Sequence, residues 1–289
     1  MAEIFCPICK KNNYELKVIT NRLRVYRCID CDIFFVNNPK KMIKTDYYND
    51  VNLRQYISYY KKFRIKYFNQ NWKTITDIKS SGKALDFGAS FGWFLECTPK
   101  TWDIVGLEPS EKAFSFARSK GINIQQGDEN KLKNKKSTYD LITLWNVFEH
   151  MPDPINLLKI FNRSLKPGGL LVIAIPNRNG LISKFSYFLS KLKIYQPIYA
   201  LFQIGKPSPH LFHYSAENIK NLLSATGFTF MFTRQQPVID IENIGKRILL
   251  EKKTNSLTYL ITKIGTIFTY YLSAIFDMND EIVIYSQKL

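Results

Sequence analysis

The chain has 289 residues, of which 45% are hydrophobic, so it can bury one sizeable core with small additions. Its 41 basic and 24 acidic residues give a net charge of +17, which favours an anionic partner: nucleic acid, a nucleotide-linked substrate or a phospholipid surface. The charge equally fits a lysine-rich composition with solvated side chains. The N-terminus lacks a secretory signal pattern, so we expect a cytoplasmic protein that could contact the inner face of the membrane.

Four cysteines near the N-terminus form two Cys-x-x-Cys pairs that are 18 residues apart; they are Cys6, Cys9, Cys28 and Cys31. Each pair can present two thiolates to one tetrahedral Zn²⁺. A closed site of four sulfurs leaves no position for a reactant, so the predicted role is structural. We expect a zinc ribbon over residues 1–40 that stabilises the fold or covers the substrate, with RNA contact as a less favoured role. A redox-active pair is the alternative.

Aromatic residues recur at helical spacing within residues 41–79, for example at Tyr56, Tyr60, Phe63 and Tyr67. The pattern predicts a helix that packs on the edge of a sheet. The same helix could act as a lid whose tyrosines line a ligand pocket. We therefore expect a helical lid or linker in this segment.

The most informative segment is Ala-Leu-Asp-Phe-Gly-Ala-Ser-Phe-Gly-Trp-Phe-Leu-Glu, residues 84–96. It predicts a buried strand ending at Asp86, a turn from Gly88 to Gly92 and the start of a helix. A second predicted strand ends at Glu108, 22 positions after Asp86. A strand, a tight turn, a helix and a strand ending in an acid are how an α/β sheet holds a nucleoside.

The turn differs from the dinucleotide-binding pattern Gly-x-Gly-x-x-Gly, because Ser90 and Trp93 break it. Asp86 at the end of the strand would repel a pyrophosphate but attract an ammonium or a sulfonium group. S-adenosylmethionine combines an adenosine, an amino acid and a positively charged sulfur, so we interpret the turn as a site for this cofactor. The alternative is a glycine turn in some other strand–helix unit.

Three later segments continue the alternation of strands and helices. Residues 122–129 predict a third strand ending in acids, and residues 139–154 predict a fourth strand that runs through Glu-His and Asp-Pro into a helix. Residues 165–177 predict a Lys-Pro-Gly-Gly turn and a fifth strand. With these motifs, over about residues 80–235, the chain resembles the class I S-adenosylmethionine-dependent methyltransferases of the small-molecule type.

The resemblance implies an α/β fold: a Rossmann-like seven-stranded sheet with helices on both faces, over residues 80–289. It also implies that the turn at Gly88 and Gly92 passes under the methionine part of the cofactor. Many relatives have glycine where Ser90 stands, so the turn is expected to be wider here or to use the hydroxyl. Asp86 is expected to orient the methionine end, directly or through water.

The remaining cofactor contacts that the resemblance implies come from later acids and one amide. Glu108 is expected to bind the ribose, and Asp128 to face the adenine amino group. Glu129 would supply a backbone contact, and Asn146 would lie near the methyl donor.

Two segments lie outside the common pattern. Residues 178–215 are rich in aromatic and aliphatic side chains, and loops at the carboxyl ends of the strands build the substrate site in this fold, so we expect a substrate-covering insertion. Residues 236–279 carry an apolar stripe at helical spacing and predict a helical insertion before the last strand. Lys263 argues against a membrane-spanning helix. A helix against the lid, a second subunit or a membrane surface is expected instead; the oligomeric state stays open.

Methylation of a hydroxyl benefits from a base, and histidine is the usual candidate. The chain has three histidines: His150, His210 and His213. The two in the insertion, His210 and His213, are the stronger candidates, because His150 is expected to hold the local turn with Glu149. Outside the cysteines we find no compact set of Asp, Asn and His residues, so a metal-dependent reaction is not expected.

The sequence therefore predicts an enzyme, a methyltransferase acting on a hydroxyl of a sugar, a nucleotide sugar or another small metabolite. Such enzymes serve polysaccharide, surface-glycan or secondary-metabolite biosynthesis. The first alternative is an RNA methyltransferase that uses the ribbon and the basic charge, although the Asn/Asp-Pro-Pro-Tyr motif of many base aminomethylators is missing. The second is a non-catalytic protein that only binds the cofactor.

Overall fold

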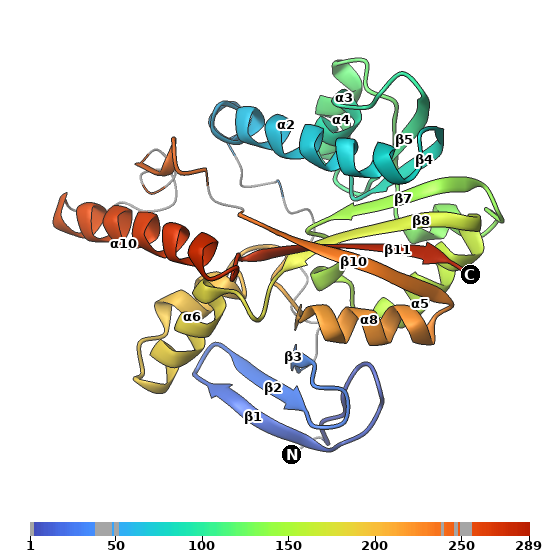
Figure 1. Cartoon of the computed structure of the whole chain (residues 1–289). Helices are drawn as coiled ribbons and strands as arrows, with labels where there is room; N and C mark the ends of the chain where they lie inside the picture. The colour runs from blue at the N-terminus through green and yellow to red at the C-terminus, as the bar shows by residue number, and fades with distance from the viewer. Residues whose placement is uncertain (1–2, 38–47, 49–51, 238–239, 246–247, 249–255) are drawn as a thin grey trace.

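The computed structural model describes residues 3–37, 48, 52–237, 240–245, 248 and 256–289 (Figure 1). Its larger sheet has the predicted seven strands. In spatial order they are β10 (Phe228–Gln236), β11 (Glu281–Lys288), β8 (Leu165–Pro176), β7 (Tyr139–Trp145), β4 (Gly82–Phe87), β5 (Trp102–Glu108) and β6 (Ile124–Gln126). The α/β fold class expected from the sequence is confirmed.

The direction of the strands determines where a ligand can bind. Strands β6, β5, β4, β7 and β8 run parallel, whereas β11 is antiparallel to both β8 and β10. The carboxyl ends of the parallel strands therefore meet at one edge of the sheet. Strand β4 is the first strand of this sheet along the chain. It pairs with β5 on one side and β7 on the other, so the strand order reverses there. Ligands of open α/β sheets bind at such a reversal.

Helices cover both faces of this sheet, as predicted (Figure 1). One face packs against α2 (Leu53–Ile78), α3 (Trp93–Glu96) and α4 (Glu111–Ser119), and the other against α5 (Pro154–Ser164) and α8 (Ala216–Ala225). Side chains alternate between the two cores along each central strand: in β8, Leu171 faces one core and Val172 the other. Each such side chain contributes roughly 1.5–3 kcal/mol when fully buried.

The N-terminal segment forms a second sheet, and its composition was not foreseen. The predicted hairpin is present as β1 (Tyr14–Ile19) and β2 (Arg24–Cys28). Next come β3 (Phe34–Val36) and then β9 (Phe212–His213), which belongs to the insertion after β8. Because β9 pairs with β3, the ribbon and the larger sheet share one hydrophobic core.

The predicted insertions are largely helical. The first contains α6 (Leu181–Lys191) and α7 (Gln196–Leu201), and the second contains α10 (Ser256–Ile275), which lies against α6. Residues 246–247 and 249–255 of the second insertion lie outside the described part. Within the described ranges, no helix combines the length and apolar character that crossing a membrane requires. What α10 contacts beyond the chain stays a prediction.

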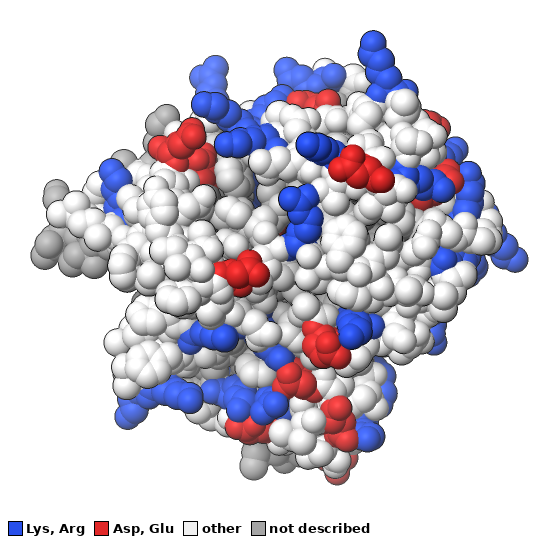
Figure 2. Space-filling view, in the orientation of Figure 1, with Lys and Arg blue, Asp and Glu red and all other residues white. Residues whose placement is uncertain are grey.

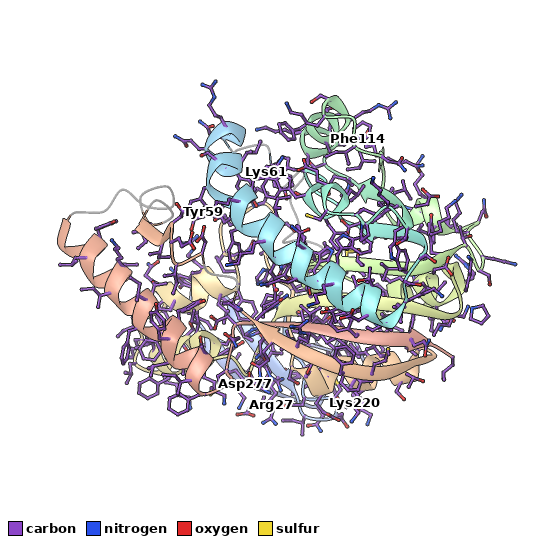
Figure 3. The ribbon with its side chains drawn as sticks, turned by 45° about the horizontal axis from the view of Figure 1, so that its top comes forward. Arg27, Tyr59, Lys61, Phe114, Lys220 and Asp277 are labelled. Atoms are coloured by element: carbon purple, nitrogen blue, oxygen red, sulfur yellow. The ribbon has the colours of Figure 1, made fainter. Side chains whose placement is uncertain are left out.

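Helix α2 accounts for most of the predicted lid segment, whose earlier residues, apart from residue 48, lie largely outside the described ranges. The helix crosses in front of the sheet in Figure 3, with Tyr59 and Lys61 in its first half and Phe114 of α4 beyond it. Its Trp72 stacks on Phe94 of α3, with ring centroids 4.6 Å apart. The helix therefore packs on the sheet, which is one of the two roles that the aromatic spacing predicted. Its role as a lid over a ligand stays a prediction.

One detail of the sequence interpretation was wrong. We expected a Lys-Pro-Gly-Gly turn followed by the fifth strand within residues 165–177. Instead β8 begins at Leu165, directly after α5, and the turn is an irregularity in its pairing with β7, with Gly168 at φ +69°. A left-handed glycine allows the chain to bulge without ending the strand.

Candidate active site

The turn after β4 has a backbone that leaves little room for other residues. Gly88 has φ +77°, and a Cβ there would lie 2.5 Å from Cγ2 of Val147. Ser90 also lies in the left-handed region, at φ +52°, which is uncommon for a residue other than glycine. Its hydroxyl is 2.6 Å from the hydroxyl of Tyr48. How the turn and this hydroxyl meet the cofactor stays a prediction.

Glu108 lies beside this turn, at the end of the neighbouring strand β5, and is buried. Its carboxylate accepts a hydrogen bond of 2.7 Å from the backbone N–H of Ser90 and one of 2.9 Å from that of Ser110. Ser110 in turn caps the N-terminus of α4. The carboxylate thus holds the glycine turn and the start of α4 together, at the position where a ribose is expected.

Asp86 is the last residue but one of β4 and is 1% exposed. The hydroxyl of Thr143 on β7 donates a hydrogen bond of 2.7 Å to its carboxylate. Burial raises the pKa of Asp86 to about 7, and this hydrogen bond opposes the rise only in part. A cationic ligand group would favour the ionised form, which agrees with the role expected at the methionine end.

Asp128 and Glu129 follow β6 at the same edge of the sheet. Asp128 caps the short 3-10 helix η1 (Glu129–Leu132), and its carboxylate accepts hydrogen bonds of 2.9 Å from both the backbone and the side chain of Asn130. β6 pairs with the end of β5, so these residues are neighbours of Glu108 along the edge. Their contacts with adenine stay predictions.

Asn146 follows β7 and begins the other side of the site, with φ +57°. Its side-chain amide donates a hydrogen bond of 2.7 Å to Glu281, the first residue of β11. Glu281 is fully buried and also accepts hydrogen bonds from the hydroxyl of Tyr67 and the amide of Gln236. Burial raises the pKa of Glu281, while the nearby Arg64 acts in the opposite direction.

The sequence interpretation missed Arg64 and Glu281, and it placed Tyr67 only among the aromatic residues of the predicted lid helix. Arg64 and Tyr67 come from α2 and Glu281 from a strand more than 200 residues later. One guanidinium nitrogen of Arg64, Nη1, is buried and has no hydrogen-bond partner among the described residues. The only signals in the sequence were a charged residue at the start of an apolar strand and an arginine within an aromatic helix.

Two of the three histidines meet at one acid. Glu149 lies in the 3-10 helix η2 (Phe148–His150) and is 1% exposed. Its Oε1 lies 3.9 Å from Nε2 of His150 and 3.8 Å from Nε2 of His210. Burial raises the pKa of Glu149 to about 8. The sequence indicated no compact set of this kind, because His210 belongs to the insertion and lies 60 positions after His150 in the chain.

His213 occupies a different environment. It lies in β9, where Nδ1 is 3.0 Å from the hydroxyl of Tyr187 and Nε2 is 3.3 Å from the hydroxyl of Ser183. Burial lowers the pKa of His213 to about 3. Both ring nitrogens are engaged inside the core, which favours a structural role over that of a base.

Comparison with known proteins supports what the geometry indicates. A family model described as a methyltransferase domain matches residues 56–231, more than half of the chain. The chain belongs to this methyltransferase family. The match includes the glycine turn and the acids along the edge of the sheet.

The curated relatives cover only part of the methyltransferase. The ubiquinone biosynthesis O-methyltransferase of Aliivibrio fischeri is 30% identical over 105 residues, which are 34% of this chain and 45% of the relative. That of Coxiella burnetii is 30% identical over 142 residues, 46% of this chain and 58% of the relative. The chain thus spans about half the length of these relatives. A solved SAM-dependent methyltransferase of Thermotoga maritima shares the fold, with a TM-score of 0.52 at 19% identity, covering 82% of this chain and 96% of the other.

The four N-terminal cysteines of the methyltransferase lie together. The Sγ atoms of Cys6 and Cys31 are 3.6 Å apart, those of Cys9 and Cys28 are 3.4 Å apart, and all four lie within 4.8 Å of one another. Zn–S bonds of ≈2.3 Å in a tetrahedron require sulfur atoms ~3.8 Å apart. The donor set therefore fits a tetrahedral metal ion. Cys97 lies apart from the set, with its thiol against the carbonyl of Ile65.

Proposed function

We propose that this methyltransferase methylates a hydroxyl oxygen of a small acceptor, with sugars and nucleotide-linked sugars as the favoured class. The observation that carries the proposal is a group of polar side chains after β7, here called the polar wall: the amide of Asn146 and the buried carboxylates of Glu149 and Glu281. The charge of Glu281 also contributes to the raised pKa of Glu149, so the two carboxylates interact. Glu281 receives its donors from the chain, whereas the carboxylate of Glu149 has none from another described residue. A buried carboxylate requires hydrogen-bond donors, and an acceptor with several hydroxyl groups supplies them.

The relatives support oxygen as the methylated atom. Those named ubiquinone biosynthesis O-methyltransferase match at about 30% identity over part of the chain. An RNA acceptor is less favoured by the distribution of charge. On the face seen in Figure 2, Lys and Arg are interspersed with Asp and Glu and with uncharged surface, rather than joined into one basic groove. Binding to RNA normally depends on such a continuous basic surface.

S-adenosylmethionine, when bound, supplies an electrophilic methyl group. The chain's own residues then have two tasks, to align the acceptor and to accept its proton. Good alignment contributes roughly 7–11 kcal/mol in such reactions. Of the predicted bases, His150 and His210 lie at the polar wall through their contact with Glu149, whereas His213 is held between Ser183 and Tyr187.

The cysteine cluster belongs to the proposal as a structural zinc site. Its support is the fit between the sulfur separations and tetrahedral Zn²⁺, together with the two knuckles in the sequence. A site of four sulfurs has no open position for a reactant. Its expected contribution is to hold the ribbon against the insertion and α8.

The test is transfer of labelled methyl groups from S-adenosylmethionine to cell extracts separated into RNA, nucleotide-sugar and lipid-linked pools. We expect the label in the nucleotide-sugar pool. In that pool Glu149→Gln should lower turnover at least tenfold while the affinity for the cofactor is kept, because the substitution changes only the acceptor side. Glu217→Gln, on the exposed start of α8, is the matched control and should transfer normally.

Each other outcome has a definite meaning. Label in RNA that is lost at high salt would replace the proposal with the RNA alternative. Cofactor binding measured by calorimetry without label in any pool would favour the non-catalytic alternative.

A further inference from the structure

The cluster of Glu149, His150 and His210 is not explained by hydrogen bonding. Neither carboxylate oxygen of Glu149 has a hydrogen-bond partner on another residue in the described part of the chain. The nearest ring nitrogens, at 3.8 and 3.9 Å, are too far for hydrogen bonds. A buried carboxylate without partners is costly, so a group that binds it is expected.

Both imidazole rings place Nε2 near the carboxylate of Glu149. Nδ1 of His150 is 3.0 Å from the backbone carbonyl of Pro209, which places the ring proton on Nδ1 and the lone pair on Nε2, the atom nearest Glu149. A metal-binding histidine commonly donates its other ring N–H to a carbonyl in this way, which fixes the tautomer.

We propose that Glu149, His150 and His210 form a binding site for a divalent metal ion of the Zn²⁺ type, separate from the four cysteines. Two imidazole nitrogens and one carboxylate oxygen suit this class of ion. The three ligand atoms lie within 4.8 Å of one another, and all three residues are largely buried. With bonds of ≈2.0–2.1 Å, a tetrahedral ion needs ligand atoms ~3.4 Å apart. Each histidine Nε2 would therefore have to move about half an ångström closer to Oε1 of Glu149.

The proposal has a consequence for catalysis that rests on the proposed function. Three protein ligands leave one position of a tetrahedral ion open, and a bound hydroxyl there has a lowered pKa. Burial lowers the pKa of His150 to about 4 and also lowers the pKa of His210. As ligands they act while neutral, which is the form that burial favours.

Metal content tests the proposal without relying on turnover. The full-length protein is equilibrated with Zn²⁺, desalted and analysed for zinc per chain. We expect two zinc ions for the wild type, and one for both Glu149→Gln and His210→Gln. His213→Gln is the matched control, because this buried histidine of the same insertion lies outside the cluster, and it should retain two. Calorimetry with S-adenosylmethionine shows whether each variant keeps its folded cofactor site.

Titration with Co²⁺ identifies which ion is lost. Thiolate-to-cobalt charge transfer marks the cysteine site, and the equivalent missing from Glu149→Gln and His210→Gln should be the one without this absorption. A wild type that binds Co²⁺ only with the thiolate signal would overturn the proposal, as would two variants that still hold both ions. Failure of the acceptor assignment alone would leave these stoichiometries unchanged.

Discussion

Asp86 links the cofactor site to the stability of the protein through one proton. Burial raises its pKa from an ordinary value near 3.8 to about 7 in the folded state, so between these values the folded chain holds a proton that the unfolded chain releases. The folded state is then favoured at low pH, and this contribution is lost as pH rises from about 4 to about 7.

Asp86→Asn should remove this dependence while keeping the hydrogen bond from Thr143. Without cofactor, the variant is expected to gain stability relative to the wild type as pH rises from about 4 to about 7, and to keep a constant advantage above that. Urea unfolding at several pH values measures the difference. Asp103→Asn, exposed on the neighbouring strand, is the control. Parallel profiles for the wild type and Asp86→Asn would refute the assignment.

Glu108 combines two tasks, holding the turn and facing the ribose. Its carboxylate accepts from the backbone N–H groups of Ser90 and Ser110. Glu108→Gln puts an amide N–H₂ where one of these donors points, and it weakens any acceptance from ribose hydroxyls. We expect the affinity for S-adenosylmethionine to fall at least tenfold, about 1.4 kcal/mol, by calorimetry. The exposed Glu111→Gln on α4 should bind normally, and an unchanged affinity for Glu108→Gln would exclude the ribose role.

At the scale of elements, the ribbon is part of the same folding unit as the larger sheet. Strand β9 of the insertion pairs with β3, and the side chain of Arg178 bonds to Asp32 of the ribbon. The amide of Asn218 on α8 donates a hydrogen bond of 3.0 Å to the carbonyl of Cys31. Loss of the cysteine site should therefore disturb more than the ribbon.

Cys31→Ser, or removal of metal with a chelator, is expected to lower the midpoint of a single thermal transition by at least about 5 °C. At this size roughly 2–4 °C corresponds to 1 kcal/mol, and a structural zinc site contributes folding energy directly. Scanning calorimetry measures the shift. Cys97→Ser, outside the cluster, should change it far less. Two separate transitions, with the larger one unmoved, would show instead that the ribbon folds independently.

The sequence predicted the elements whose signals are local. The glycine turn, the acids that end the strands and the cysteine spacing each lie within a short segment, so their residue types alone indicate strands, a cofactor turn and a metal site. Contacts between distant segments were missed. Nothing near Phe212 indicates that it pairs with Phe35 of the ribbon, and nothing near Glu149 indicates that His210 arrives beside it. Such pairings depend on how the whole chain packs.

At the scale of the molecule, helix α2 and the last strand, β11, are joined by hydrogen bonds although they lie far apart in the chain. Tyr67 of α2 donates its hydroxyl to Glu281 of β11, 214 positions away. Tyr285 of the same strand donates a hydrogen bond of 3.0 Å to Asn71, again on α2. The helix that precedes the first strand of the large sheet is thus attached to the last strand, next to Asn146 at the end of β7.

A double-mutant cycle measures this attachment. Tyr67→Phe removes a donor from a fully buried carboxylate and should cost about 1–3 kcal/mol of stability in urea unfolding. Combined with Glu281→Gln, the loss should differ from the sum of the single losses by about 1 kcal/mol, because the two groups share one contact. Thr226→Val is the control partner, since its hydroxyl bonds within α8, and it should add to Tyr67→Phe within about 0.5 kcal/mol. Additive losses for the first pair would mean that the contact between Tyr67 and Glu281 contributes nothing to stability, so that α2 would be held on the larger sheet by its other contacts.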